Sequence, residues 1–176
     1  MIKETERFAD STVFEGMTSL RAVIEAAERQ ISDRRILRVL YDRGRADAKA
    51  RELAWLRRMG ERLGFPLAEC SAEEIDRLAT GASHGGILAE CSERTIPPLT
   101  AASLPARGFA VMLEGIEDPY NFGYALRTVY AAGADAVILT PRNWIIAAGV
   151  VCRSSAGASE LLPLYVADGA DAADLM

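Results

Sequence analysis

Along the first half of the chain, hydrophobic residues occur either at helical spacing or in short continuous runs. The change from one pattern to the other predicts helices and strands in turn. Apolar residues at helical spacing indicate amphipathic helices, and short continuous apolar runs indicate strands. Ser71, with Glu74 three residues later, forms a capping box that marks the start of one helix. The expected elements are, in order, a helix over residues 18–30, a strand over 36–41, a helix from Ala50 to near Gly64, a helix that begins after Ser71 and a strand over 86–91.

The second half of the chain has a more regular succession of strand and helix, which predicts a parallel sheet. Residues 95–107 contain three prolines and several small residues, a composition typical of a linker. The elements expected after it are a strand over 109–113, a helix over 121–132, a strand over 136–139, a helix over 143–153, a turn over 154–157, a strand over 162–166 and the opening of another helix. The sequence therefore predicts an α/β fold, with a small α/β module over residues 1–94, a linker over 95–107 and a Rossmann-like parallel-sheet domain over 108–176.

The composition is that of an ordinary globular chain, but its charge is unevenly distributed. The 176 residues carry a formal net charge of -5. The segment from Arg21 to Arg62 has twelve basic and seven acidic residues, a local net charge of +5, whereas the rest of the chain carries -10. Arginine predominates there, and its planar guanidinium can donate two hydrogen bonds to one phosphate. The alternative is that these basic residues form solvated helix faces and pair with Glu25, Glu28, Asp47 and Glu52.

Several classes of protein are disfavoured by the sequence. The longest strongly apolar stretch, from Trp144 to Cys152, has nine residues, whereas roughly 20 are needed to cross a bilayer. The charged N-terminus lacks the apolar core of a signal peptide, so we expect a cytoplasmic protein with no membrane partner. Cys70, Cys91 and Cys152 are odd in number and far apart, which argues against a disulfide framework and against a metal site.

Residues 117–128 carry the candidate chemistry, because ligands bind beyond the carboxyl ends of parallel strands and this stretch leaves such an end. Asn121 lies where a helix N-cap is expected. Arg127 follows Gly123 by four residues, so Arg127 is expected to project back over Gly123. A cation near the positive end of a helix costs up to about 1 kcal/mol, which suggests an anionic partner such as phosphate. In the alternative, Asn121 is only a cap, Gly123 only allows close packing against the sheet instead of leaving space for Arg127, and Arg127 pairs with Glu117 or Asp118.

This stretch resembles the first signature motif of the SpoU/TrmH family of ribose 2′-O-methyltransferases, a branch of the knotted SPOUT class. The motif stands here as Asp118-Pro119-Tyr120-Asn121-Phe122-Gly123, then Arg127-Thr128, then Gly133-Ala134. Two further stretches are similar to the family, namely Ser155-Ala156-Gly157-Ala158 followed by Leu162-Pro163, and His84-Gly85-Gly86-Ile87, in which Gly85 replaces the usual Gln. The helix after Gly16 and the basic region that follows it look like the RNA-binding module of the family.

The resemblance implies the transfer of a methyl group from S-adenosylmethionine to a ribose 2′-hydroxyl of ribosomal or transfer RNA, in a homodimer whose active site lies at the subunit interface. It also implies that Arg127 activates the hydroxyl or binds the neighbouring phosphate, and that Asn121 organises the reacting groups. Because arginine normally stays protonated, we favour phosphate positioning for Arg127 over a role as a base. The implied RNA contacts are Arg34, Arg35, Arg38, Arg153 and Ser155.

Two family motifs, Gly-x-Glu-x-x-Gly and Ile-Pro-x with a later Ser-Leu-x, are not found in the sequence. By resemblance they form the knot and the cofactor pocket, so we expect the cofactor-binding residues after residue 176 and expect this chain alone not to bind S-adenosylmethionine normally. Two other classes remain open: a non-catalytic RNA-binding module and a small-molecule α/β enzyme. RNA binding that weakens steeply with salt would separate the first two classes from the third.

Overall fold

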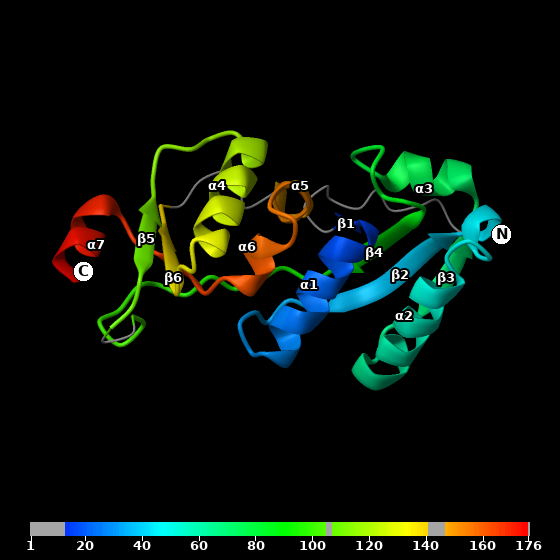
Figure 1. Cartoon of the computed structure of the whole chain (residues 1–176), viewed down its shortest axis with the longest axis horizontal. Coiled ribbons are helices and arrows are strands. Elements are labelled where there is room, and N and C mark those ends of the chain that lie inside the picture. The colour runs from blue at the N-terminus through cyan, green and yellow to red at the C-terminus, as the bar shows by residue number, and fades with distance from the viewer. Residues whose placement is uncertain (1–12, 105–106, 141–146, 176) are drawn as a thin grey trace.

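The computed structural model describes residues 13–104, 107–140 and 147–175, which form two α/β parts, each built on its own sheet (Figure 1). The first part contains β1 (Val13–Glu15), α1 (Gly16–Glu28), β2 (Ile36–Asp42), the 3-10 turn η1 (Arg43–Arg45), α2 (Ala50–Leu63), β3 (Leu67–Cys70), α3 (Ala72–Leu78) and β4 (Ile87–Cys91). The second contains β5 (Ala110–Leu113), α4 (Pro119–Ala131), β6 (Ala136–Leu139), α5 (Ala148–Ser154), α6 (Ala158–Leu161), β7 (Leu164–Val166) and α7 (Gly169–Leu175).

The first sheet is mixed and has the strand order β1-β4-β2-β3. β2 pairs with β3 in parallel, whereas β4 runs antiparallel to both β1 and β2. α1 and α2 cover one face through a core that includes Phe14, Val39 and Leu56, and α3 covers the other face through Ile75. The helices and strands predicted for this part are confirmed, and α2 ends at Gly64, whose φ of 83° is the left-handed conformation that glycine adopts without strain.

The second sheet has the order β5-β6-β7 and all its pairings are parallel, which confirms the predicted fold class. Its central strand, β6, is buried along its whole length. Val137 and Leu139 pack with α4 on one face, and Ile138 packs with Ala172 of α7 on the other. A strand covered on both faces needs a continuous apolar sequence, which is why residues 136–139 could be assigned from the pattern alone.

Four short elements were not predicted, namely β1, η1, β3 and α6. The single turn of α6 occupies the residues just before the expected strand, so β7 begins at Leu164 instead of residue 162. The helix expected over 143–153 corresponds to α5 in the described residues, and residues 143–146 lie outside them. None of the described helices has the length and hydrophobicity needed to cross a bilayer.

Part of the expected linker packs against the second sheet. The amide of Leu99 donates to the carbonyl of Val166 at 2.8 Å, and the amide of Val166 donates to the carbonyl of Pro97 at 2.9 Å. The Leu99 side chain is buried beside Ile138. Residues 97–99 therefore extend the sheet beyond β7, while the domain boundary within residues 95–107 stays a prediction.

The two parts share a buried interface made by α5 and α6, which lie between the two sheets (Figure 1). Cys152 of α5 belongs to the core of the first part. Arg34 of the first part donates from Nε to Glu160 Oε2 of α6 at 3.1 Å, and both side chains are buried. Arg94 donates to the carbonyl oxygens of Ser159 and Leu162 at 2.6 and 2.9 Å.

Burial makes the three thiols unequal. Desolvation raises the pKa of Cys152 to about 12 and raises the pKa of Cys91 well above its ordinary value. Desolvation and the charge of Glu74 also raise the pKa of Cys70, but Cys70 is only partly buried and reagents can reach it. Since the thiolate is the reactive form, we expect one fast-reacting thiol per folded chain with a disulfide reagent at pH 8, and three after unfolding in urea. The variant Cys70→Ser should remove the fast phase. A fast phase that survives in that variant would contradict the buried placement of the other two cysteines.

Candidate functional site

The helix α4 begins at Pro119, two residues earlier than expected, and this corrects the role assigned to Asn121. The N-cap is Asp118, whose Oδ1 accepts a hydrogen bond from the amide of Asn121 at 2.8 Å. Pro119 occupies the first helical position, where its fixed φ and missing N–H are favourable. Asn121 therefore lies inside the first turn, and its exposed carboxamide is not used as the cap.

One face of α4 is open to solvent and carries both residues predicted to be catalytic. Asn121 and Arg127 are exposed, and in the described part of the chain Arg127 forms no ion pair with Glu117 or Asp118. The alternative in which a loop carboxylate pairs with Arg127 is therefore not observed. Tyr124, on the same face, is 55% exposed and does not belong to the core.

Gly123 lies on the buried side of α4 that adjoins this face, and it packs against α5. A Cβ at this position would lie 1.9 Å from Ser154 Oγ, 2.9 Å from Ser154 Cβ and 3.0 Å from the amide nitrogen of Ser155. Gly123 is itself buried, so it serves the close approach of α4 to α5. The expectation that Gly123 makes room for Arg127 is thus replaced by a packing role between two helices.

Arg153 and Ser155, which were expected to contact RNA, are both held by the protein. Arg153 forms an ion pair with Glu15, and its Nη2 donates to the hydroxyl of Tyr120 at 3.1 Å. The hydroxyl of Ser155 is buried, donates to the carbonyl of Cys152 at 3.1 Å and accepts from the amide of Ser159 at 3.1 Å. We therefore withdraw Ser155 as an RNA contact and regard Arg153 as a bridge between α5, β1 and the start of α4.

Glu15 is the partner that sequence reasoning missed. It is 4% exposed, and its Oε1 accepts hydrogen bonds from the amide and hydroxyl of Thr80, at 2.5 and 2.7 Å, and from the amide of Gly81 at 3.1 Å. Together with Arg153, this buried carboxylate joins the end of β1 to the turn after α3. A glutamate directly after two apolar strand residues was the only local sign of an inward-facing acid.

The three arginines predicted to bind RNA in the basic region occupy different environments. Arg34 is 6% exposed and is paired with Glu160. Because it is buried, Arg34 is not available for the expected contact with RNA. Arg35 is exposed. Arg38 is partly exposed, and its Nε lies 2.7 Å from Glu90 Oε2. The solvated-pair alternative holds for part of the region, since Arg29, Arg62 and Lys49 pair with Glu25, Glu28 and Glu52 respectively.

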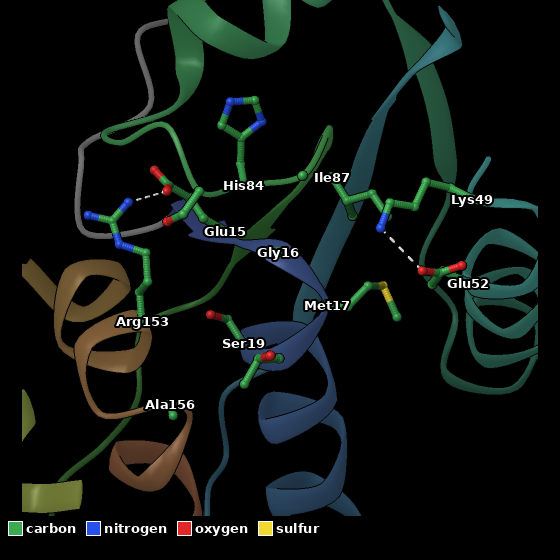
Figure 2. A pocket seen from close by; sticks show the side chains of 13 residues that line it. Glu15, Gly16, Met17, Ser19, Lys49, Glu52, His84, Ile87, Arg153 and Ala156 are labelled. Atoms are coloured by element: carbon green, nitrogen blue, oxygen red, sulfur yellow. Dashed lines mark hydrogen bonds and ion pairs between the residues drawn. The ribbon is translucent and has the colours of Figure 1, made fainter. Parts of the chain in front are cut away.

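A cleft of about 310 Å³ lies between the first part and α5 (Figure 2). Its walls come from the β1–α1 junction, the residues around the start of α2, the loop over residues 83–87 and α5. His84 is buried in this loop, where Nδ1 accepts from the amide of Gly86 at 3.1 Å and Nε2 lies 3.2 Å from Asp76 Oδ1. The ring therefore fixes the loop that forms one wall of the cleft.

The fold and the site define a class of protein with a small mixed-sheet module joined to a parallel sheet that carries an exposed arginine on its first helix. Residues 108–175 match the SpoU rRNA Methylase family, and residues 20–97 match the family described as RNA 2'-O ribose methyltransferase substrate binding. The chain belongs to the SpoU family, as the sequence motifs predicted.

Relatives and solved structures agree with this assignment. The chain is 31% identical over 158 residues to rRNA methyltransferase 1, mitochondrial, from Homo sapiens, covering 87% of this chain and 43% of that protein. It is 30% identical over 141 residues to 23S rRNA (guanosine-2'-O-)-methyltransferase RlmB from Shewanella oneidensis, covering 76% of this chain and 55% of that protein. This chain thus spans about half the length of these relatives.

The fold is also found in crystal structures of low sequence identity. An rRNA methyltransferase from Sinorhizobium meliloti matches 94% of this chain and 59% of its own length, with a TM-score of 0.67 and 19% identity. A structure described as an RNA 2'-O ribose methyltransferase matches 97% of this chain and 61% of its own length, with a TM-score of 0.68 and 20% identity.

The carboxyl edge of the second sheet is where a cofactor is expected to bind in a parallel-sheet protein. Thr140, directly after β6, has a buried hydroxyl with no hydrogen-bond partner, which is one free polar group at the position where parallel sheets bind ligands. S-Adenosylmethionine has a base, a ribose and an amino-acid group to satisfy. The Thr140 hydroxyl can satisfy one of these groups, and the place of the other cofactor-binding residues stays a prediction from the sequence.

Proposed function

We propose that the protein transfers a methyl group from S-adenosylmethionine to a ribose 2′-hydroxyl of ribosomal RNA. The observation that carries the proposal is the exposed pair Asn121 and Arg127 on the helix that leaves the carboxyl end of β5. The family assignment supports the reaction class. Two relatives are named as methyltransferases of ribosomal RNA, which supports ribosomal RNA as the substrate. A homodimer and a cytoplasmic location stay predictions that follow from the resemblance and the sequence.

The proposed chemistry needs a ribose oxygen that is held in line with the methyl carbon while its proton leaves. Arg127 is a permanent cation, so its guanidinium donates two hydrogen bonds to a phosphate next to the target ribose and orients the hydroxyl. Asn121 lies six residues before Arg127 on the same helix. Its carboxamide can both donate and accept hydrogen bonds, and it holds the ribose or the loop beside it. Arg35 and Arg38 contribute phosphate contacts away from the reacting atoms.

Removal of the Arg127 guanidinium tests this assignment in the protein expressed from its natural gene. Arg127→Gln is expected to lower kcat/KM for methyl transfer to ribosomal RNA by roughly 10- to 100-fold, the loss of a charge-assisted hydrogen bond made in the transition state. Transfer of tritium from labelled S-adenosylmethionine gives the rate. Since Arg127 is exposed, the thermal midpoint should change little.

The matched control is Arg29→Gln, which removes the same charge from the exposed end of α1. It should leave kcat/KM within about twofold, because surface pairs of this kind contribute little. Equal losses in the two variants would contradict a specific role for Arg127. Protein from the natural gene that transfers no methyl group to any ribosomal RNA would overturn the proposed function itself.

A further inference from the structure

The cleft between the two parts has the size and position of a ligand site, and nothing in the proposed reaction uses it. Its volume of about 310 Å³ lies at the lower end of the range of about 300–1,000 Å³ in which proteins hold small molecules. We propose that this cleft binds one unpaired nucleotide of the RNA substrate, next to the nucleotide that α4 presents for methylation. The inference rests on the proposed function, because it takes RNA as the substrate.

The lining of the cleft matches the mixed character of a nucleotide. Met17, which is partly exposed, supplies apolar surface, which suits the flat face of a base. Thr18 and Ser83, which are exposed, bring hydroxyl groups, which suit the polar edge of a base or a ribose. Proteins that recognise RNA sequence mostly bind unpaired, splayed bases in this way, because side chains cannot read the deep groove of an RNA helix.

Two cations lie at opposite sides of the cleft, Lys49 near the start of α2 and Arg153 on α5 (Figure 2). Lys49 Nζ is 3.2 Å from Glu52 Oε1, and the two side chains are 31% and 29% exposed. A half-open pair of this kind is weak, and the ammonium has two further hydrogens to donate, so it can accept a phosphate at little cost. Arg153 stays paired with Glu15, which also lines the cleft, so Lys49 is the cation that a phosphate beside the bound nucleotide can reach.

The position of Arg153 connects the cleft to the proposed catalytic helix. Its Nη2 reaches the hydroxyl of Tyr120 at 3.1 Å, and the guanidinium carbon lies 6.0 Å from the centre of that ring. Tyr120 immediately precedes Asn121 in the first turn of α4. An RNA strand whose target ribose lies at Asn121 and Arg127 therefore reaches the cleft within its neighbouring nucleotides. On the far wall, a Cβ at Gly85 would meet nothing within 4 Å, so the loop leaves this side open for entry.

Photocrosslinking locates the nucleotide directly. The 176-residue chain is mixed with a single-stranded RNA dodecamer that carries one central 4-thiouridine, irradiated in the near ultraviolet and analysed by peptide mass spectrometry. We expect crosslinks within residues 16–19 or 83–87, the two segments that line the cleft. Crosslinks found only outside the cleft, in a chain that binds the RNA, would overturn the inference and leave the proposed function standing.

A charge-matched pair of variants gives a second test by titration. Lys49→Gln is expected to weaken binding of the dodecamer by 3- to 10-fold and to reduce the slope of log affinity against log salt by roughly 0.7, the value for one lost contact to a single-strand phosphate. The control Arg58→Gln removes one exposed charge from the same helix, outside the cleft, and should change neither quantity. Equal effects of the two variants would overturn the inference. A wild-type chain with no salt-sensitive RNA binding would overturn both the inference and the proposed RNA substrate.

Discussion

Replacement of Arg34 by Met is expected to lower the free energy of unfolding by about 3–5 kcal/mol, the usual cost of removing one partner from a buried ion pair. The Arg34 guanidinium donates to Glu160 at 3.1 Å and to the carbonyl of Ser92 at 2.6 Å. Met fills a similar space but removes the guanidinium that is hydrogen-bonded to Glu160, which is 2% exposed and then keeps only the electrostatic attraction of Arg94 among the neighbours described. Because a domain is stable by only about 5–15 kcal/mol, urea denaturation followed by tryptophan fluorescence should show a large fall in the midpoint.

Two further variants separate burial from the mere loss of an ion pair. Arg29→Met breaks the pair between Arg29 and Glu25, whose side chains are 53% and 52% exposed, and should cost less than about 0.5 kcal/mol. The double variant Arg34→Met/Glu160→Leu removes both charges and should recover most of the lost stability. If Arg34→Met costs no more than Arg29→Met, the interface between the two parts is not closed in solution.

Arg34 also marks the limit of what the sequence could tell about this protein. Its neighbours in the chain are basic, so the local pattern indicated an RNA contact. Its actual partner, Glu160, is 126 residues away. A pairing between residues so far apart in the chain depends on how α6 packs against the first part. The spacing of residues in the sequence therefore does not predict it. The same holds for Glu15 and Arg153, which are 138 residues apart.

Features that depend on neighbouring residues were predictable. The capping box of Ser71 and Glu74 starts α3, and the four apolar residues of β6 were assigned with the bounds that the structure has. β1 and β3 were missed because they have three and four residues and lack a clear alternation of buried and exposed positions. These strands exist because β4 and β2 offer them hydrogen-bonding edges.

The candidate site was found in the sequence by its motif, but the roles within it needed the structure. The pattern identified the helix that carries Asn121 and Arg127, and both are exposed. The cap was assigned to the wrong residue because both Asp118 and Asn121 are good caps, and only the position of Pro119 at the first helical residue decides between them. The cleft had no sequence signal, because its walls come from four segments that are distant in the chain.

Gly123→Ala is expected to lower the free energy of unfolding by about 3 kcal/mol, at the upper end of the usual cost of overpacking. The added Cβ would lie 1.9 Å from Ser154 Oγ and 2.9 Å from Ser154 Cβ. The hydroxyl can rotate, but Cβ is fixed to the backbone of α5, so α4 and α5 must move apart. Because Phe122 and Leu126 anchor α4 in the core of the second part, that movement also exposes apolar surface. Thermal or urea denaturation measures the loss.

The cause of the loss can be tested by removing the atoms that clash. Ser154→Gly in the Gly123→Ala background takes away both nearest atoms and leaves the amide nitrogen of Ser155 at 3.0 Å. The double variant should therefore be more stable than the sum of the single effects, by about 1–2 kcal/mol in a double-mutant cycle. Gly44→Ala, whose Cβ would meet only Asp42 Oδ1 at 3.3 Å, is the matched control and should cost less than about 1 kcal/mol. Additive effects of Gly123→Ala and Ser154→Gly would show that α4 and α5 do not meet at this glycine, and the exposed face that carries Arg127 would then be oriented by other contacts.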